Sequence, residues 1–126
     1  MWVFTRYGFV SIACANKPDG KIDESTVMVR ARSRQHLESL KTRFPNTELG
    51  NAEILKSAGT DYEYRLVIPK AAWVAILSDL AMEQTWSNFK NEAARFDRTK
   101  RGSGRYLKAL HRVWEIMFAV QADEER

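Results

Sequence analysis

The feature that most constrains this chain is an alternation of apolar and polar side chains directly ahead of a helical pattern. Val27, Val29 and Ala31 occupy every second position. Because side chains alternate across a β-strand, these three share one face, while Arg30 and Arg32 share the other. The pattern predicts a strand with one core face and one face that carries arginines, in a sheet that a second layer covers on its core side.

Apolar spacing along the rest of the chain predicts three more strands and four helices. The predicted elements, in chain order, are a long kinked strand over 2–15 with a bend at Gly8, a strand over 26–31, a helix over 33–43, strands over 52–57 and 62–68, and helices that begin near Pro69, Ser87 and Tyr106. Three apolar residues, Leu37, Leu40 and Phe44, form the stripe of the first helix, and Trp73, Ile76 and Leu80 form that of the second. In the strand over 62–68, Tyr62 is expected on the same face as Leu66.

This order contains two ββα units. It predicts a single α+β domain in which an antiparallel sheet has helices packed on one face, followed by C-terminal helices. The predicted parts of this domain (1–126) are two hairpins and the first helix (2–68), a helical part (69–121), a basic flexible connection (98–105) and an acidic tail (122–126).

The composition indicates a globular protein outside the membrane. Of 126 residues, 44% are hydrophobic and 29% are charged, and the apolar runs are far shorter than the roughly 20 residues that span a bilayer. Cys14 is the single cysteine and stands in an apolar stretch, which favours a small buried hydrophobe in a reducing compartment. The N-terminus has no export pattern. We therefore expect a cytoplasmic location and no membrane partner.

Basic residues concentrate near the C-terminus. Between positions 88 and 112 there are eight basic and two acidic residues, a local charge of +6 that exceeds the +4 of the whole chain. The candidate binding residues in this segment are Lys90, Arg95, Arg98, Lys100, Arg101, Arg105 and Lys108. Such side chains neutralise phosphates, so nucleic acid is one predicted partner. An acidic protein surface and a loop that is merely solvated are the alternatives.

A second candidate group combines arginines with aromatic rings. If the first two predicted strands pair, Arg6, Arg30 and Arg32 lie close together. Aromatic side chains expected nearby are Trp2, Phe4 or Tyr7. Arginine beside aromatic rings on an open sheet is typical of a base-stacking or phosphate-binding surface, although the same residues can simply cover an exposed sheet.

A third candidate is a polar cleft formed by Asp61, Tyr62 and Asn88 with the cations Arg65 and Lys90. The alternative is structural, because Asp and Asn at strand starts and helix ends often close turns through hydrogen bonds to the backbone.

Enzymatic patterns are not evident. His36 and His111 are each isolated on a predicted helix, and no cluster has metal-ligand spacing. The glycines at 102 and 104 lack the pattern of a phosphate-binding loop and the strand that would precede it. We therefore expect no catalytic residue, no metal and no cofactor.

Several short motifs are spread along the chain. They are Trp2-x-Phe4-Thr5 with Gly8-Phe9 and Ser11, Val29-Arg30-Ala31-Arg32 with His36-Leu37, Gly59-Thr60-Asp61-Tyr62, Asn88-Phe89-Lys90 and Trp114. Together they resemble a family of small uncharacterised bacterial proteins. The resemblance covers most of the chain and implies a bacterial, cytoplasmic, single-domain protein of a kind that mobile elements carry. It implies no activity and no role for any residue.

The sequence thus predicts a non-enzymatic binding module for a polyanionic partner, most simply nucleic acid, bound through the basic loop and the arginine-bearing sheet face. The alternative is a protein-binding regulator or inhibitor of phage or mobile-element origin that acts on a host complex. A small enzyme is the least favoured of the three hypotheses.

Overall fold

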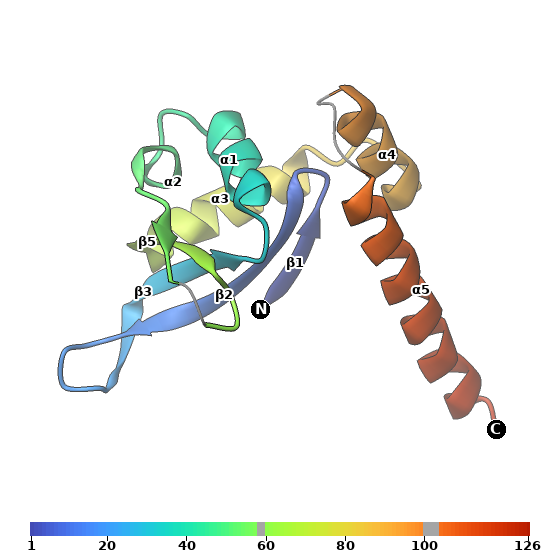
Figure 1. Ribbon diagram of the computed structural model, residues 1–126, viewed down its shortest axis with the longest axis horizontal. Helices are drawn as coiled ribbons and strands as arrows, with labels where there is room; N and C mark the ends of the chain where they lie inside the picture. Colours follow the sequence, from blue (N-terminus) through green and yellow to red (C-terminus); the bar gives the residue numbers. More distant parts are fainter. Residues whose placement is uncertain (58–59, 100–103) are drawn as a thin grey trace. The chain divides into compact units, whose positions relative to one another are not determined.

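The computed structural model describes residues 1–57, 60–99 and 104–126. The chain divides into two compact units, Met1–Thr85 and Trp86–Arg126 (Figure 1). Among the described residues, every strand lies in the first unit together with three helices, and the second unit contains two helices. The predicted α+β class and antiparallel sheet are confirmed. The boundary between the two units follows Thr85. The helical part of the chain was predicted to start earlier, at 69.

The first unit is built on a five-stranded antiparallel sheet with the strand order β1-β2-β3-β5-β4. The strands are β1 (Trp2–Thr5), β2 (Gly8–Asn16), β3 (Ile22–Ala31), β4 (Leu55–Lys56) and β5 (Tyr64–Pro69). The predicted pairing of the strands over 26–31 and 2–15 appears as β2 with β3, and the second predicted hairpin appears as β4 with β5. The pairing of β3 with β5 joins the two hairpins into one sheet.

The prediction of one kinked strand over 2–15 is wrong. The chain reverses at Arg6 and Tyr7, so that β1 and β2 form a hairpin with Thr5 opposite Gly8. The Thr5 hydroxyl donates to the Gly8 carbonyl (2.9 Å) and accepts from the backbone N–H groups of Tyr7 and Gly8, both at 3.1 Å. Gly8 has a φ of +143°. The turn has no proline or Asn-Gly signal, and apolar residues continue on both sides of it, so the pattern alone does not reveal the reversal.

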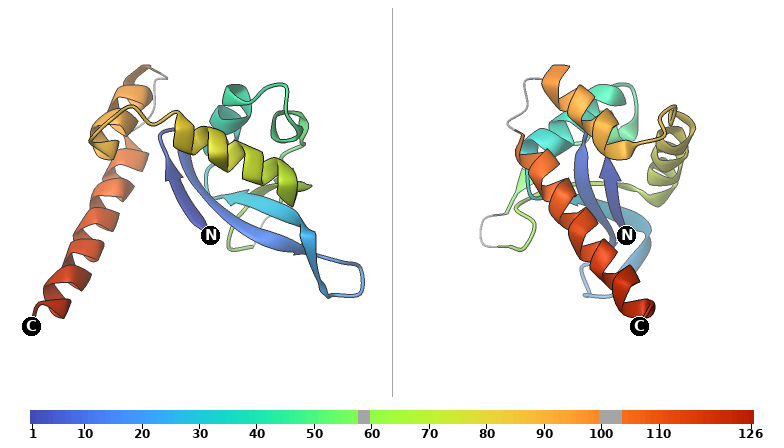
Figure 2. Two further views of the ribbon diagram at one scale, coloured as in Figure 1. Left: turned by 180° about the vertical axis from the view of Figure 1, so that it is seen from behind. Right: turned by 90° about the vertical axis from the view of Figure 1, so that its right-hand side faces the viewer.

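One face of the sheet forms the core. Its buried side chains come from three adjacent strands: Val10 and Ile12 of β2, Val27, Val29 and Ala31 of β3, and Leu66 and Ile68 of β5. The predicted alternation in β3 is therefore confirmed. The helices of the first unit, α1 (Arg34–Arg43), α2 (Glu48–Asn51) and α3 (Lys70–Met82), lie on this face (Figures 1 and 2). Cys14, at the far end of β2, is half-buried.

Both predicted helical stripes face the core. Leu37, Leu40 and Phe44 are buried at one end of the sheet, and Trp73, Ile76 and Leu80 are buried along α3. The short helix α2 was not predicted. Its N-cap is Thr47, whose hydroxyl accepts a hydrogen bond from the backbone N–H of Gly50 (3.1 Å).

The second unit contains α4 (Phe89–Thr99) and α5 (Arg105–Glu124). The predicted basic connection over 98–105 is shorter than expected, since α4 includes Arg98 and α5 begins at Arg105. Lys100 and Arg101 lie outside the described residues, as does the side chain of Arg98. The predicted acidic tail over 122–126 is mostly helical, because α5 continues to Glu124. Within the described ranges, no helix is long and apolar enough to cross a membrane.

Candidate functional site

The face of the sheet opposite the helices carries a row of side chains in register across all five strands. From β1 to β4 the row consists of Trp2, Ser11, Arg30, Arg65 and Leu55. Side chains directly opposite each other in an antiparallel pair lie roughly 5 Å apart at Cβ. The register therefore sets two arginines opposite each other in the middle of this face, which no helix of the first unit covers (Figure 2).

Arg30 on β3 and Arg32 just beyond the strand both stack on the ring of Tyr62. The guanidinium carbons of Arg30 and Arg32 lie 4.7 and 4.3 Å from the centroid of the Tyr62 ring. Tyr62 is buried. It precedes β5 and lies on the arginine side of the sheet, so the prediction that it shares a face with Leu66 is wrong. The strand pattern was extended two residues too far toward the N-terminus, into a bend whose side-chain directions no longer alternate.

The two facing arginines are held mainly by neutral groups. Arg30 donates from Nη2 to the hydroxyl of buried Ser11 (2.8 Å). Arg65 donates from Nη2 to the Thr60 hydroxyl (3.2 Å) and to the Tyr62 carbonyl (3.1 Å). Within the part of the chain that the structure describes, the Nε of Arg65 is buried without a hydrogen-bond partner. Like charges directly opposite each other in a sheet destabilise it.

Negative charge near the arginines comes from Asp61. Arg32 donates from Nη1 to the Asp61 carboxylate (3.1 Å) and carbonyl (2.8 Å). The hydrogen bond that Arg32 donates to the Asp61 carboxylate raises the pKa of Arg32, against the opposing effect of burial. Among the described residues, neither Arg30 nor Arg65 forms an ion pair. The surface therefore has an excess of positive charge.

Aromatic rings continue the site toward β1. Phe4 and Phe9 are stacked with centroids 4.6 Å apart, and Trp2 meets Phe9 edge-on at 5.7 Å. Phe9 also lies 6.5 Å from the Tyr62 ring. Trp2 is 69% exposed. We name this surface the arginine–aromatic face, and its members are Trp2, Phe4, Phe9, Arg30, Arg32, Tyr62 and Arg65. Its rings can stack on planar groups and its guanidinium groups can bind anions.

Arg6 was grouped with Arg30 and Arg32, but the structure places it elsewhere. It lies in the β1–β2 turn, where its Nη2 is 3.5 Å from Glu83 at the end of α3. Glu83 also accepts from the Tyr7 hydroxyl (2.9 Å) and from Arg43 at the end of α1 (2.9 Å). The cause is the β1–β2 reversal, which directs Arg6 to the helices. These contacts tie a turn and two helix ends together.

The predicted polar cleft divides between the two units. Asp61, Tyr62 and Arg65 come together on the arginine–aromatic face. Asn88 belongs to the second unit, where its side chain accepts from the N–H of Asn91 (3.0 Å) and so caps α4, which is the structural alternative considered above. Lys90 lies over the Trp114 ring within the same unit, with Nζ 4.9 Å from the ring centroid.

The other predicted cations of the second unit lie on α4 and α5. Arg95 forms an ion pair with Glu92, one turn earlier on α4. Arg105 and Lys108 lie in the first turn of α5. Lys100 and Arg101, the centre of the predicted basic loop, are among the residues the structure does not describe.

Sequence reasoning missed the contribution of Phe9 and Ser11. A signal was present, because Phe9, Ser11 and Ala13 alternate with buried Val10 and Ile12. That alternation assigns the two faces only if β2 starts at Gly8. The prediction of a single strand over 2–15 did not include this start.

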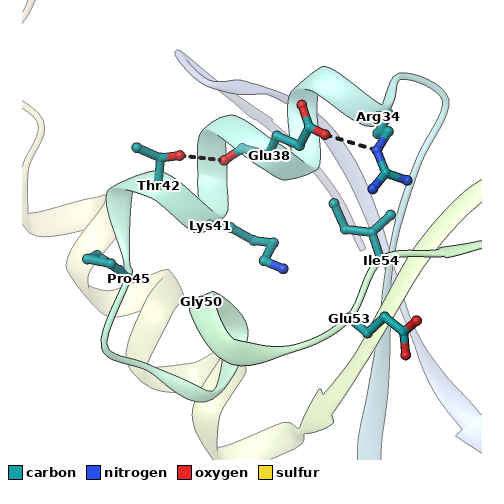
Figure 3. A pocket seen from close by; sticks show the side chains of 8 residues that line it. All are labelled: Arg34, Glu38, Lys41, Thr42, Pro45, Gly50, Glu53 and Ile54. Atoms are coloured by element: carbon teal, nitrogen blue, oxygen red, sulfur yellow. Dashed lines mark hydrogen bonds and ion pairs between the residues drawn. The ribbon is translucent and has the colours of Figure 1, made fainter.

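An open hollow of about 550 Å³ lies between α1 and the segment that follows it (Figure 3). Its polar groups mostly bind one another or the backbone. Arg34 pairs with Glu38 at 2.9 Å, and Lys41 donates to the Ala52 carbonyl. The remaining lining residues are Thr42, Pro45, Gly50, Glu53 and Ile54.

The described residues contain no cluster of three or more His, Cys, Asp or Glu side chains that could hold a metal ion. Comparison of the chain with protein-family models, with curated proteins and with solved structures found no match. The arginine–aromatic face is therefore the best-defined candidate site, on its geometry alone.

Proposed function

We propose that the protein is a nucleic-acid-binding module that holds a single strand on its arginine–aromatic face. The observation that carries this proposal is the register of Arg30 directly opposite Arg65, with no ion pair to either among the described residues. A phosphate bound between two such guanidinium groups relieves their repulsion and gains charge-assisted hydrogen bonds.

Exposed rings favour nucleic acid over an acidic protein surface as the ligand. Trp2 is the most exposed ring of the face, and Phe9 adjoins it. Bases stack on aromatic side chains and contribute about 1–3 kcal/mol each, whereas carboxylates gain nothing from such contacts. Because bases in a duplex are already stacked on each other, a sheet face of this kind is suited to single strands. That Lys100, Arg101 and Arg105 contact phosphate stays a prediction from the sequence.

The test compares two single-charge variants in the binding of a labelled single-stranded oligonucleotide of mixed sequence. Arg32→Ala removes a cation from the face, and Arg34→Ala removes one from α1 on the opposite side of the sheet. The two side chains are matched, at 55% and 51% exposed, and each pairs with one carboxylate. Removing one cation that binds a phosphate of a single strand lowers the slope of log K against log salt by about 0.7. We expect that change for Arg32→Ala and not for Arg34→Ala.

A second variant tests the stacking. Trp2→Ala should weaken binding about 5- to 150-fold, which corresponds to the range for one stacked base. Met82→Ala, which removes an exposed side chain at the end of α3, is its control. No measurable binding at about 50 mM salt, where phosphate contacts are strong, overturns the proposal. Equal effects of Arg32→Ala and Arg34→Ala also overturn it, because they indicate an effect of net charge alone. The protein-binding regulator predicted from the sequence is then the hypothesis to pursue, by capture of a single dominant partner.

A further inference from the structure

Helix α5 exposes a large amount of apolar surface from Trp114 onward. Five bulky side chains there are about half exposed or more: Trp114, Ile116, Met117, Phe118 and Val120. Val113, Met117 and Val120 follow the spacing of a single helical stripe, which continues from buried Leu110. Contiguous apolar surface of this kind marks an interaction site in a protein of this size.

The charges at the two ends of α5 are the reverse of those that stabilise an isolated helix. Arg105 and Lys108 stand in the first turn, which contains no acidic residue. Asp123 and Glu124 stand at the other end, where the last turn contains no basic residue and the nearest cation is Arg126 beyond the helix, 3.9 Å from the Asp123 carboxylate. Because the helix macrodipole is positive at the N-terminus and negative at the C-terminus, both ends carry the unfavourable charge. These end charges therefore destabilise an isolated α5.

We propose that α5 packs against the α5 helix of a second copy of this chain, in antiparallel orientation. A twofold axis near position 115, between Val113 and Met117, places the apolar stripe of one helix on that of the other. It also brings the basic first turn of each helix beside the acidic last turn of its partner. The same axis sets the two macrodipoles head to tail. Both unfavourable features of α5, its exposed stripe and its end charges, are thereby relieved by one contact.

Self-complementarity is the reason to name a second copy rather than another protein. An interface with twofold symmetry requires that one surface supply both halves of every contact. Here one helix carries a cation in its first turn, at Arg105, and an anion in its last turn, at Asp123, on the same flank of the apolar stripe. A 20-residue helix is about 30 Å long, which is enough for several turns of paired stripe. The inference is independent of nucleic-acid binding.

The first experiment measures the mass of the full-length protein in solution over a concentration series, by light scattering and sedimentation. A dimer is expected. The double substitution Met117→Glu with Val120→Glu should raise the dimer dissociation constant at least a hundredfold. The matched control is Met82→Glu, which adds a charge at a highly exposed methionine of α3 and should leave the dimer intact. Circular dichroism of each variant shows whether the helices are still formed.

The second experiment tests the orientation through the charges. Asp123→Lys with Glu124→Lys places cations beside the basic first turn of the partner, so the dimer should weaken about tenfold or more. Adding Arg105→Glu and Lys108→Glu to that variant restores opposite charges and should recover the dimer. A protein that is monomeric at every concentration overturns the proposal. So does a dimer that survives Met117→Glu with Val120→Glu, or one that the first charge reversal strengthens.

Discussion

Replacing Gly8 with alanine tests the close packing of the β1–β2 hairpin against α1. A Cβ atom built at Gly8 lies 2.2 Å from Cγ of His36 and 2.5 Å from its Cβ and Cδ2. Distances this short require the histidine or the hairpin to move. His36 is not free to turn away, because its Nδ1 accepts a hydrogen bond from the backbone N–H of Phe9 (3.2 Å).

The expected cost has three parts. Gly8 has a φ of +143°, and a side chain in such a sparsely populated region costs about 1–3 kcal/mol. Overpacking against a fixed neighbour costs about 1–3 kcal/mol. Loss of the hydrogen bond between Phe9 and His36 costs about 1 kcal/mol. Together these contributions predict that Gly8→Ala lowers the free energy of unfolding by about 3–7 kcal/mol, a large part of the 5–15 kcal/mol that is usual for a domain.

Gly20 provides the matched control. It also has a positive φ, of +85°, but a Cβ atom there meets nothing within 4 Å. Gly20→Ala therefore incurs backbone strain alone, about 1 kcal/mol or somewhat more. The assay is urea unfolding followed by circular dichroism, with the free energy extrapolated linearly to water. In a double-mutant cycle, His36→Ala should reduce the cost of Gly8→Ala by about 1–3 kcal/mol, since it removes the atoms that the new methyl meets. A cost for Gly8→Ala within 1 kcal/mol of that for Gly20→Ala refutes this reasoning.

Two further predictions concern the sheet and the alkaline limit of stability. Leu66→Ala should lower the free energy of unfolding by about 2–5 kcal/mol, because Leu66 is fully buried. Val67→Ala should lower it by less than about 1 kcal/mol, because Val67, its neighbour in β5, is exposed. Equal losses in urea unfolding would contradict the assignment of the two faces of β5. Burial raises the pKa of Tyr7 above 10.0 in the folded state, and the nearby Glu83 carboxylate acts in the same direction. A raised folded-state pKa gives stability that is complete below pH 10 and is lost as the pH rises further. Above pH 10 the free energy of unfolding should therefore fall in the unmodified protein, and it should fall by less in Tyr7→Phe. An identical decline in both proteins would show that Tyr7 does not contribute.

Local periodicity was sufficient to predict several parts of this protein. The two faces of β3, the stripes of α1 and α3, and the arginine side of the sheet depend on which positions in one segment point the same way. Backbone geometry sets that repeat whatever the segment packs against. For this reason Arg30 and Arg32 could be placed opposite the core from the sequence alone.

Tertiary structure decided which segments meet. The pairing of β3 with β5 sets Arg30 opposite Arg65, which are 35 positions apart in the sequence. The reversal after β1 takes Arg6 away from those arginines and brings it to Glu83. These partners depend on strand order and chain reversal, which follow from the burial of the whole core rather than from any short pattern of residues. The sequence by itself thus determined which face of β3 carries arginines, and the fold determined which side chains surround them.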